Sequence, residues 1–341
     1  MKILTLDDGI PGHWSMTAGL VKLFRNLRDV EETRVHVDWR WGGARQAFQR
    51  LERSGIQVPK LLFQPMVRFS PPIQSKPDLI VSRGGATLFA NGWLAREWSC
   101  PNVFIGTVRK LPTRFFSAVI LYQDDTHPPP YVAMPLFPTR IEPASLGERV
   151  ASFPWSEGPP TGEIAAMFLG GDGSGYQWQM ADWQALATGM RLMHESSGVR
   201  WCVTSSRRTP AEVESLLDKE LPPAAIAESC WWHAGDRRPS VDAFLGVAKH
   251  AFCTEDSMSM LEECIASGRP TVALGLGTAK PNGFFSEYLQ QRVNSRRLKR
   301  FDVNRFAPGV AYPVNCDGGW NPVGPEAMSE SAASLLDRLG L

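Results

Sequence analysis

Residues 250–275 read HAFCTEDSMSMLEECIASGRPTVALG and contain a complete strand–helix–strand pattern. The pattern predicts a strand over 250–254, a helix over 257–267 and a second strand over 271–275. Gly268 stands where the end of a helix favours a left-handed residue, and Pro270 leads into the next strand. Two strands joined by a helix pair in parallel through a right-handed crossover, so this stretch predicts one unit of an α/β fold.

The same alternation extends over the rest of the chain. Further strands are predicted over residues 3–6, 34–39, 78–82, 102–107, 118–122, 164–169, 200–204 and 229–232. Further helices are predicted over residues 16–27, 177–196, 210–221 and 240–248. Residues 138–162 are rich in Pro, Gly and Ser and lack periodicity, which is typical of a connection between domains.

The expected architecture is therefore α/β, with two Rossmann-like lobes that face a cleft. Their expected limits are residues 1–150 and 151–322, followed by a helix within 323–341. That helix has one apolar face, which we expect to pack back on the first lobe; the face consists of Met328, Ala332, Leu335, Leu336 and Leu339. A chain of 341 residues is also longer than a typical single core.

Composition excludes several classes of protein. With 43% hydrophobic and 21% charged residues and a formal net charge of +1, the chain taken as a whole has no electrostatic attraction for nucleic acid or for an anionic membrane. No apolar run reaches the ~18 residues of a membrane span, and no secretion signal opens the chain. The six cysteines form no Cys-x-x-Cys pair, so neither a zinc cage nor a disulfide framework is indicated. A cytoplasmic location is the expectation.

The stretch after the strand at 250–254 is the strongest candidate for a binding site. A side chain at 256 or 257 could cap the helix, and Ser259 with Glu262 has capping-box spacing. The first-turn amides point to the carboxyl edge of the sheet, where open α/β sheets bind ligands. Glu263 could accept hydrogen bonds from a ribose diol, although an ordinary capped helix with a solvated acidic face would have the same pattern. The candidate residues are Asp256, Ser257, Met258, Ser259 and Glu263.

A second candidate is the glycine-rich stretch GGDGSGY at residues 170–176. It follows the strand at 164–169 and precedes a long helix, whose N-terminus would add partial positive charge. Glycines let the backbone approach a phosphate closely; the candidate residues are Gly170, Gly171, Gly173 and Ser174. The stretch lacks the Lys-Ser/Thr of a P-loop and the spacing of a G-x-G-x-x-G fingerprint. A flexible strand-to-helix turn is the alternative.

A third candidate is TSSRRTP at residues 204–210, which again follows a strand. Ser206, Arg207 and Arg208 suit anion binding at the start of a helix, and a solvated basic turn is the alternative. Because all three stretches end strands of one predicted sheet, we expect them to converge on one crevice.

In the first half, residues 7–13 (DDGIPGH) join the first strand to the first helix. This turn would hold His13 at a helix N-terminus, where partial positive charge favours a neutral imidazole that can take a proton. A packing or capping role is the alternative. The stretches at 82–85 and 106–110 end two more strands, and their Arg83 and Arg109 either bind an acceptor or phosphate or are ordinary surface charges.

Two other stretches have weaker patterns. Residues 124–127 (DDTH) resemble a set of metal ligands, but three prolines follow and indicate an extended loop, so no metal is expected. Residues 292–300 (RVNSRRLKR) could contact phosphate or lipid headgroups, and a solvated helix face is the preferred interpretation.

The stretches GIPGH, TSSRRTP and TEDSMSMLEECIASGRP together resemble the mitochondrial fission ELM-type family, whose members are described as glycosyltransferases. That family resembles in turn the transferase that adds N-acetylglucosamine to the lipid-linked peptidoglycan precursor. The resemblance matches Gly12-His13 and residues 170–175 to its two glycine-rich turns. It also matches Glu263, five residues before Gly268, to its ribose-binding glutamate.

The resemblance implies a GT-B fold, with an acceptor domain over 1–150 and a nucleotide-sugar-binding domain over 151–322. Two departures bear on specificity: Ile10-Pro11 replaces part of the first glycine cluster, and residues 236–241 (DRRPSV) replace an Asn-Pro-Tyr-like segment near the base.

The expected activity is sugar transfer from a nucleotide-diphosphate donor to a saccharide or lipid-linked acceptor, with inversion. His13 is the expected base, and the donor is a substrate, so no further cofactor is expected. A peripheral contact with the inner membrane stays open. A nucleotide-sugar 2-epimerase of the same fold, or a non-catalytic scaffold in membrane division or envelope organisation, are the alternatives.

Overall fold

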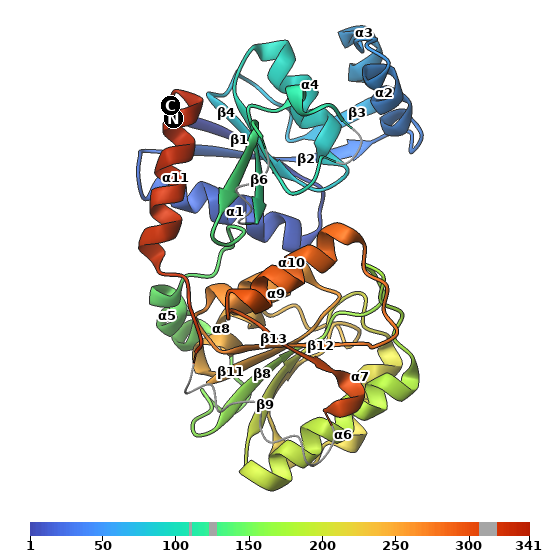
Figure 1. The fold of residues 1–341 in the computed structure, drawn as a ribbon, viewed down its shortest axis with the longest axis vertical. Helices are drawn as coiled ribbons and strands as arrows, with labels where there is room; N and C mark the ends of the chain where they lie inside the picture. The colour runs from blue at the N-terminus through green and yellow to red at the C-terminus, as the bar shows by residue number, and fades with distance from the viewer. Residues whose placement is uncertain (109–110, 123–127, 307–318) are drawn as a thin grey trace. The chain divides into compact units, whose positions relative to one another are not determined.

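The computed structural model describes residues 1–108, 111–122, 128–306 and 319–341. Contacts divide the chain into two units. The first consists of Met1–Arg140 with Val323–Leu341, and the second consists of Ile141–Pro322. Each unit, called the first and the second lobe below, contains a sheet flanked by helices (Figure 1).

The sheet of the first lobe has the strand order β3-β2-β1-β4-β5-β6-β7. Its pairs are parallel except β2 with β3. The strands are β1 (Lys2–Asp7), β2 (Glu31–Trp39), β3 (Val67–Ser70), β4 (Leu79–Arg83), β5 (Asn102–Ile105), β6 (Ala118–Tyr122) and β7 (Tyr131–Met134). The helices are α1 (Pro11–Arg25), α2 (Ala44–Arg53), α3 (Lys60–Phe63), α4 (Thr87–Trp98) and α11 (Pro325–Leu339).

The sheet of the second lobe is parallel throughout, with the order β10-β9-β8-β11-β12-β13. Its strands are β8 (Ile164–Phe168), β9 (Arg200–Thr204), β10 (Ile226–Cys230), β11 (His250–Thr254), β12 (Thr271–Gly275) and β13 (Lys299–Asp302). The helices are α5 (Leu146–Ser152), α6 (Met180–Ser197), α7 (Ala211–Glu220), α8 (Ser240–Val247), α9 (Met258–Ala266) and α10 (Gly283–Asn294).

Both sheets follow the doubly wound order, in which the direction of winding reverses beside the first strand. The reversal lies between β1 and β4 in the first lobe and between β8 and β11 in the second. Strand β8 is buried along its whole length, as expected for a strand covered on both faces. The expected fold, two Rossmann-like lobes of the GT-B type, is confirmed.

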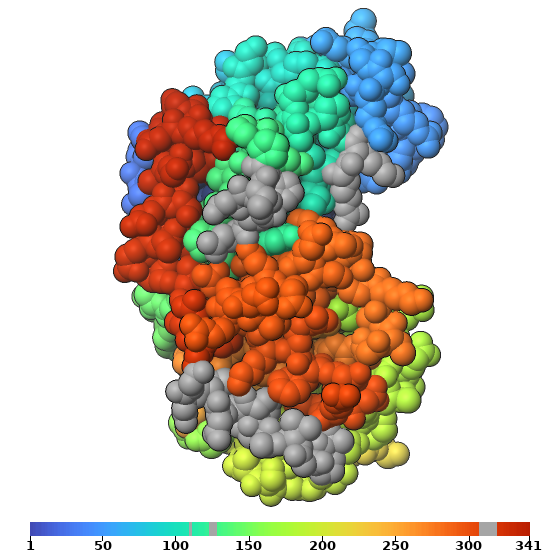
Figure 2. Space-filling model, viewed as in Figure 1, coloured from blue at the N-terminus to red at the C-terminus, as the bar shows by residue number. Residues whose placement is uncertain are grey.

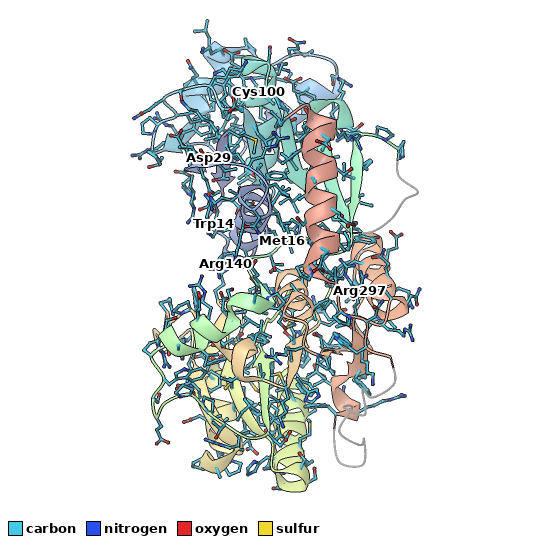
Figure 3. All side chains as sticks on the ribbon, turned by 90° about the vertical axis from the view of Figure 1, so that its left-hand side faces the viewer. Trp14, Met16, Asp29, Cys100, Arg140 and Arg297 are labelled. Atoms are coloured by element: carbon cyan, nitrogen blue, oxygen red, sulfur yellow. The ribbon has the colours of Figure 1, made fainter. Side chains whose placement is uncertain are left out.

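The first helix and the last one meet in the first lobe. Helix α1 begins at Pro11, five residues before the predicted start, because proline is well suited to the first position of a helix. Its Met16 is fully buried, and α11 packs against α1 and β7 (Figure 3). No helix among the described residues has both the length and the apolar content that crossing a membrane requires.

The division between the two units, at Arg140 and Ile141, lies within the stretch 138–162, and this stretch also contains α5, which packs on α8. One expectation about local structure is wrong. Residues 292–300 do not form a solvated basic helix face. Arg292 lies in the last turn of α10 with a fully buried side chain, and Arg300 belongs to β13 and pairs with buried Glu255.

Arg292 and Glu262 form a buried ion pair between α10 and α9, with 2.7 Å between Nε and Oε1. Glu262→Gln leaves the guanidinium without a countercharge in the interior. We expect the free energy of unfolding to fall by about 3–5 kcal/mol, measured by urea unfolding. The matched control is Glu195→Gln in the exposed Arg191–Glu195 pair, with an expected cost of about 0.5 kcal/mol or less. An equal loss of unfolding free energy in the two variants would contradict the assignment of Arg292 and Glu262 as a buried ion pair that stabilises the fold.

Candidate functional site

Three loops meet at the carboxyl edge of the second sheet, beside the reversal of strand order. They are residues 169–179 after β8, 205–210 after β9 and 255–257 after β11. Because β9, β8 and β11 are neighbours in the sheet, their loops leave it side by side. The convergence predicted from the sequence is therefore present, and it lies where open α/β sheets bind ligands.

Asp256 contacts the other two loops. Its side chain is buried, at 1% exposure. Its Oδ2 accepts a hydrogen bond from the backbone N–H of Gly171 at 3.0 Å and lies 2.7 Å from Nη2 of Arg208. Beside it, Oγ1 of Thr254 accepts a hydrogen bond from the N–H of Gly170 at 2.6 Å. Because a buried carboxylate is costly unless it is paired, these contacts fix the three loops together.

The loop after β9 adds contacts to the glycine-rich loop. The hydroxyl of Thr209 donates to the carbonyl of Gly170 at 2.6 Å, and the hydroxyl of Ser206 donates to the same carbonyl at 3.2 Å. Nη1 of Arg208 donates to the carbonyl of Asp172 at 3.2 Å. The side chain of Arg208 is therefore held at the junction of the loops before any ligand binds.

Close packing explains the need for glycine in the loop after β8. A Cβ atom at Gly171 would lie 2.1 Å from the carbonyl oxygen of Arg208, which real Cβ atoms do not tolerate. Gly173 and Tyr176 exchange backbone hydrogen bonds of 2.9 and 3.1 Å, and Ser174 between them has a φ of +55°. The loop is thus a tight, internally bonded turn and not a flexible connection.

A second buried carboxylate, Glu255, anchors the far end of this turn. It accepts a hydrogen bond from the Tyr176 hydroxyl at 2.5 Å and pairs with Arg300, whose Nη2 lies 2.9 Å away. Burial, with Glu255 beside it, raises the pKa of Tyr176 well above its usual range, so the phenol stays a hydrogen-bond donor. Glu255 lies within the quoted stretch 250–275, but its spacing gave no sign of this anchoring role.

One prediction about the glycine-rich loop is wrong. The helix after it, α6, begins only at Met180 and is closed by a capping box between Gln179 and Asp182. The loop therefore does not run directly into a helix N-terminus, and the capping box already satisfies two backbone N–H groups at the start of α6. Any anion at this loop would depend on the loop's own backbone and on its neighbours.

The capping predicted for α9 is also wrong. Ser257 is the N-cap residue, but its side chain makes no capping hydrogen bond, and Asp256 is engaged by the neighbouring loops. Ser259 lies inside the helix, and Glu262 forms the buried ion pair, so no capping box exists. An N-terminus without a side-chain cap, such as that of α9 at Met258, is the arrangement in which helices bind anions.

The remaining candidates occupy the same edge of the lobe by sequence position. Arg207 is exposed on the loop after β9, and within the described residues it forms no ion pair. Glu263 lies in the second turn of α9 and is 6% exposed. Direct contacts join Gly170, Gly171, Ser206, Arg208 and Asp256, whereas Gly173, Ser174, Arg207, Ser257, Met258, Ser259 and Glu263 lie on the same loops or on α9.

The first lobe has a polar pair at its own reversal of strand order. His13, in the first turn of α1, has Nδ1 2.9 and 3.0 Å from the two carboxylate oxygens of Asp8. A Cβ atom at Gly84, on the loop after β4, would lie 2.1 Å from Asp8 and 2.5 Å from His13, so glycine makes room for the pair. Since a carboxylate accepts, the proton belongs on Nδ1, which leaves Nε2 as the basic nitrogen.

The turn that carries this pair is rigid. Asp7 accepts from the N–H of Gly9 at 3.0 Å and pairs with Arg34. The guanidinium of Arg34 lies 3.6 Å from the ring centre of Trp14, which is on α1 (Figure 3). The partnership of Asp8 with His13 was missed from the sequence, although an aspartate five residues before the histidine, in the same turn, was the available signal.

The other first-lobe candidates divide into two groups. Arg83 is not a solvated surface charge, because Nη1 donates to the carbonyl of Ile105 at 3.3 Å and the guanidinium lies 5.2 Å from the ring centre of Phe137. Arg109, and the stretch 124–127 that resembles metal ligands, lie outside the described residues.

With this geometry established, comparison identifies the family. A sequence model described as mitochondrial fission ELM1 matches residues 11–317. The chain belongs to this family. No match was found among curated protein sequences.

Solved structures resemble this ELM1-family chain in fold. UDP-GlcNAc 2-epimerases from Methanocaldococcus jannaschii and from Neisseria meningitidis each have a TM-score of 0.58 and 12% identity, with 99% of both chains covered. The kitacinnamycin glycosyltransferase has a TM-score of 0.51 and 14% identity, with 99% of this chain and 94% of that one covered.

Burial raises the pKa of Asp256 to about 6, from an ordinary 3.8, although Arg208 and the Gly171 N–H act in the opposite direction. The folded state therefore binds this proton more tightly than the unfolded state. The resulting stability is fully present below about pH 3.8 and is lost as the pH rises through about 6.

We expect Asp256→Asn to remove this part of the pH dependence, which amounts to about 3 kcal/mol at most. The measurement is urea unfolding at a series of pH values across that window. Asp218→Asn, at an exposed position of α7, should leave the pH dependence of the parent chain unchanged. Parallel curves for the Asp256 variant and the parent would show that this carboxyl does not titrate in the window.

Proposed function

We propose that this ELM1-family chain is a glycosyltransferase that takes its sugar from a nucleoside-diphosphate donor held by the second lobe. The observation that supports this most is the meeting of three strand-to-helix loops around Asp256, Gly171 and Arg208. The edge they form combines backbone amides, an uncapped helix end and arginines. Such a combination suits a diphosphate better than any neutral ligand.

The donor is assigned to these groups as follows. The diphosphate lies against the amides of residues 171–174 and of Ser257–Ser259, with Arg207 and Arg208 as its countercharges. Glu263, in the second turn of α9, accepts hydrogen bonds from the ribose hydroxyls. The Neisseria meningitidis epimerase, which is similar in fold, was solved with UDP-GlcNAc bound, and this supports a nucleotide sugar as the donor.

The proposed chemistry is a single displacement. Nε2 of His13 takes the proton of an acceptor hydroxyl while its oxygen bonds to the anomeric carbon of the donor. The bond from that carbon to the phosphate oxygen breaks, and its electron pair leaves with the nucleoside diphosphate. Asp8 keeps the imidazole in the tautomer that leaves Nε2 free and stabilises the imidazolium that forms. Attack opposite the leaving group inverts the anomeric centre.

The epimerases of similar fold define the competing activity. Epimerisation at C2 removes and returns a proton at carbon, which calls for acid–base groups around the sugar. Among the residues of the first lobe that the structure describes, the strand-order reversal offers one such pair, His13 with Asp8. One base is sufficient for a single displacement, and we therefore favour transfer over epimerisation.

Donor binding is testable without knowledge of the acceptor. We expect Arg207→Gln to weaken binding of the preferred diphosphate about 10- to 100-fold, because a charged hydrogen bond is lost. Glu263→Gln should weaken binding of nucleoside diphosphates and leave the affinity for pyrophosphate unchanged. The measurement is titration calorimetry with UDP, GDP, ADP, dTDP and pyrophosphate, with Arg191→Gln as the control. Indifference of the parent chain to every nucleotide would favour a scaffold and refute the proposal.

The first-lobe pair is tested by turnover. His13→Gln removes the proposed base. Asp8→Asn replaces a carboxylate, which only accepts hydrogen bonds, with an amide that can also donate to Nδ1 of His13. The amide can therefore stabilise the tautomer whose proton is on Nε2. Each should lower turnover about 10²- to 10⁴-fold and leave the donor affinity unchanged. The measurement is release of nucleoside diphosphate with a lipid extract of the source cells as acceptor, and nuclear magnetic resonance of the product's anomeric centre. A retained configuration would refute the single displacement, and free epimerised sugar nucleotide without acceptor would favour the epimerase.

A further inference from the structure

Exposed apolar side chains gather in one segment of the first lobe. In the described part of the chain, six large hydrophobic side chains are exposed, and four of them lie between residues 41 and 62. Leu61 is 86% exposed and Trp41 62% exposed, and the other two are Ile56 and Leu62. Single exposed hydrophobic residues need no explanation, but a concentration of them marks an interaction surface. We call residues 40–68 the basic–apolar corner.

The local fold explains why these side chains face solvent. Helix α2 turns Phe48 inward, and the single turn of α3 turns only Phe63 inward, where it stacks on Trp93 at 3.9 Å. Leu61 and Leu62, in the same turn, are left outside. Both helices lie together at one edge of the lobe, and the blue atoms at the upper right of Figure 2 form this corner (Figures 1 and 2).

The charge of the corner is strongly one-sided. Its cations are Arg40, Arg45, Arg50, Arg53, Lys60 and Arg68, and its one acid is Glu52. Glu52 is buried and pairs with Arg96 at 2.7 Å, so it does not offset the exposed cations.

Two acids flank the corner. Glu97 pairs with Lys60 at 3.0 Å, and Asp38 lies opposite Arg68 between β2 and β3. Arg40, Arg50 and Arg53 are exposed and, among the described residues, enter no ion pair. An excess of unpaired positive charge thus surrounds the exposed leucines.

We propose that the basic–apolar corner docks on an anionic lipid bilayer. Aliphatic and indole side chains enter the interfacial region of a bilayer, while arginines beside them contact headgroup phosphates. A nucleic acid would match the arginines but would leave Ile56, Leu61 and Leu62 in water. The inference is independent of the donor site, which belongs to the second lobe.

The test is sedimentation of the full chain with vesicles of phosphatidylcholine alone and of phosphatidylcholine mixed with phosphatidylglycerol. We expect binding to the mixed vesicles only, and weaker binding as salt increases. Arg50→Gln with Arg53→Gln should lower the partition coefficient about 25-fold, at about fivefold for each arginine. Leu61→Ser with Leu62→Ser should lower it roughly tenfold or more at unchanged charge.

Controls separate docking from loss of the fold and from other partners. Met180→Ser, which removes an exposed apolar side chain of the second lobe, should leave vesicle binding unchanged. All variants should retain the melting temperature and the nucleotide affinity of the parent. The proposal is overturned if the parent does not bind mixed vesicles, or if the leucine variant binds them as well as the parent does. It is also overturned if these leucines instead hold two copies of the chain together in light scattering, or if oligonucleotides compete the vesicles away.

Discussion

The candidate site depends on the contacts that the buried carboxylate of Asp256 makes with two neighbouring loops. One oxygen accepts a hydrogen bond from Gly171 and pairs with Arg208, so a single group links loops that follow three different strands. Thr254 and Glu255 also hold the glycine-rich turn from the β11 side, through the N–H of Gly170 and the hydroxyl of Tyr176, but neither of them reaches the loop after β9 as Asp256 does. A ligand site made of loops needs such a tie, because each loop that must be ordered on binding reduces the affinity.

The two lobes solve the same structural problem with different chemistry. Each places an aspartate with a buried side chain in or beside a glycine-containing turn at the reversal of strand order, where open α/β sheets bind ligands. In the second lobe the aspartate holds an arginine, which suits the binding of an anion. In the first lobe Asp8 holds His13, which suits the movement of a proton. The doubly wound sheet thus fixes where a site forms, and the side chains at the reversal determine what the site can do.

The sequence predicted the lobes well because strand–helix alternation is a local signal, and it predicted the meeting of three loops because parallel strands end at one edge. The sequence could not distinguish residues that are adjacent in the chain and differ only in their tertiary contacts. Glu262 and Glu263 are adjacent in one helix, and the sequence could not indicate that Glu262 pairs with Arg292, a residue 30 positions away. For the same reason Arg292 looked like part of a solvated basic run. The capping predicted at the start of α9 failed likewise, because Asp256 is engaged by residues 85 and 48 positions earlier in the chain.

An acidic side chain inside an anion-binding site repels the ligand only if no neighbouring group balances its negative charge. Asp256 is held by a guanidinium and a backbone amide, so the junction is close to neutral before a diphosphate arrives. In the proposed donor complex, the attraction for the ligand is assigned to Arg207, to the loop amides and to the N-terminus of α9. Arg208 can contribute only by sharing its charge between the carboxylate and the phosphate. Burial has already weakened the preference of Asp256 for the ionised form, so the balance between these two partners is set close to neutral pH. The contacts of Asp256 thus order the junction in the absence of a ligand, and the proposed diphosphate would compete with this carboxylate for Arg208.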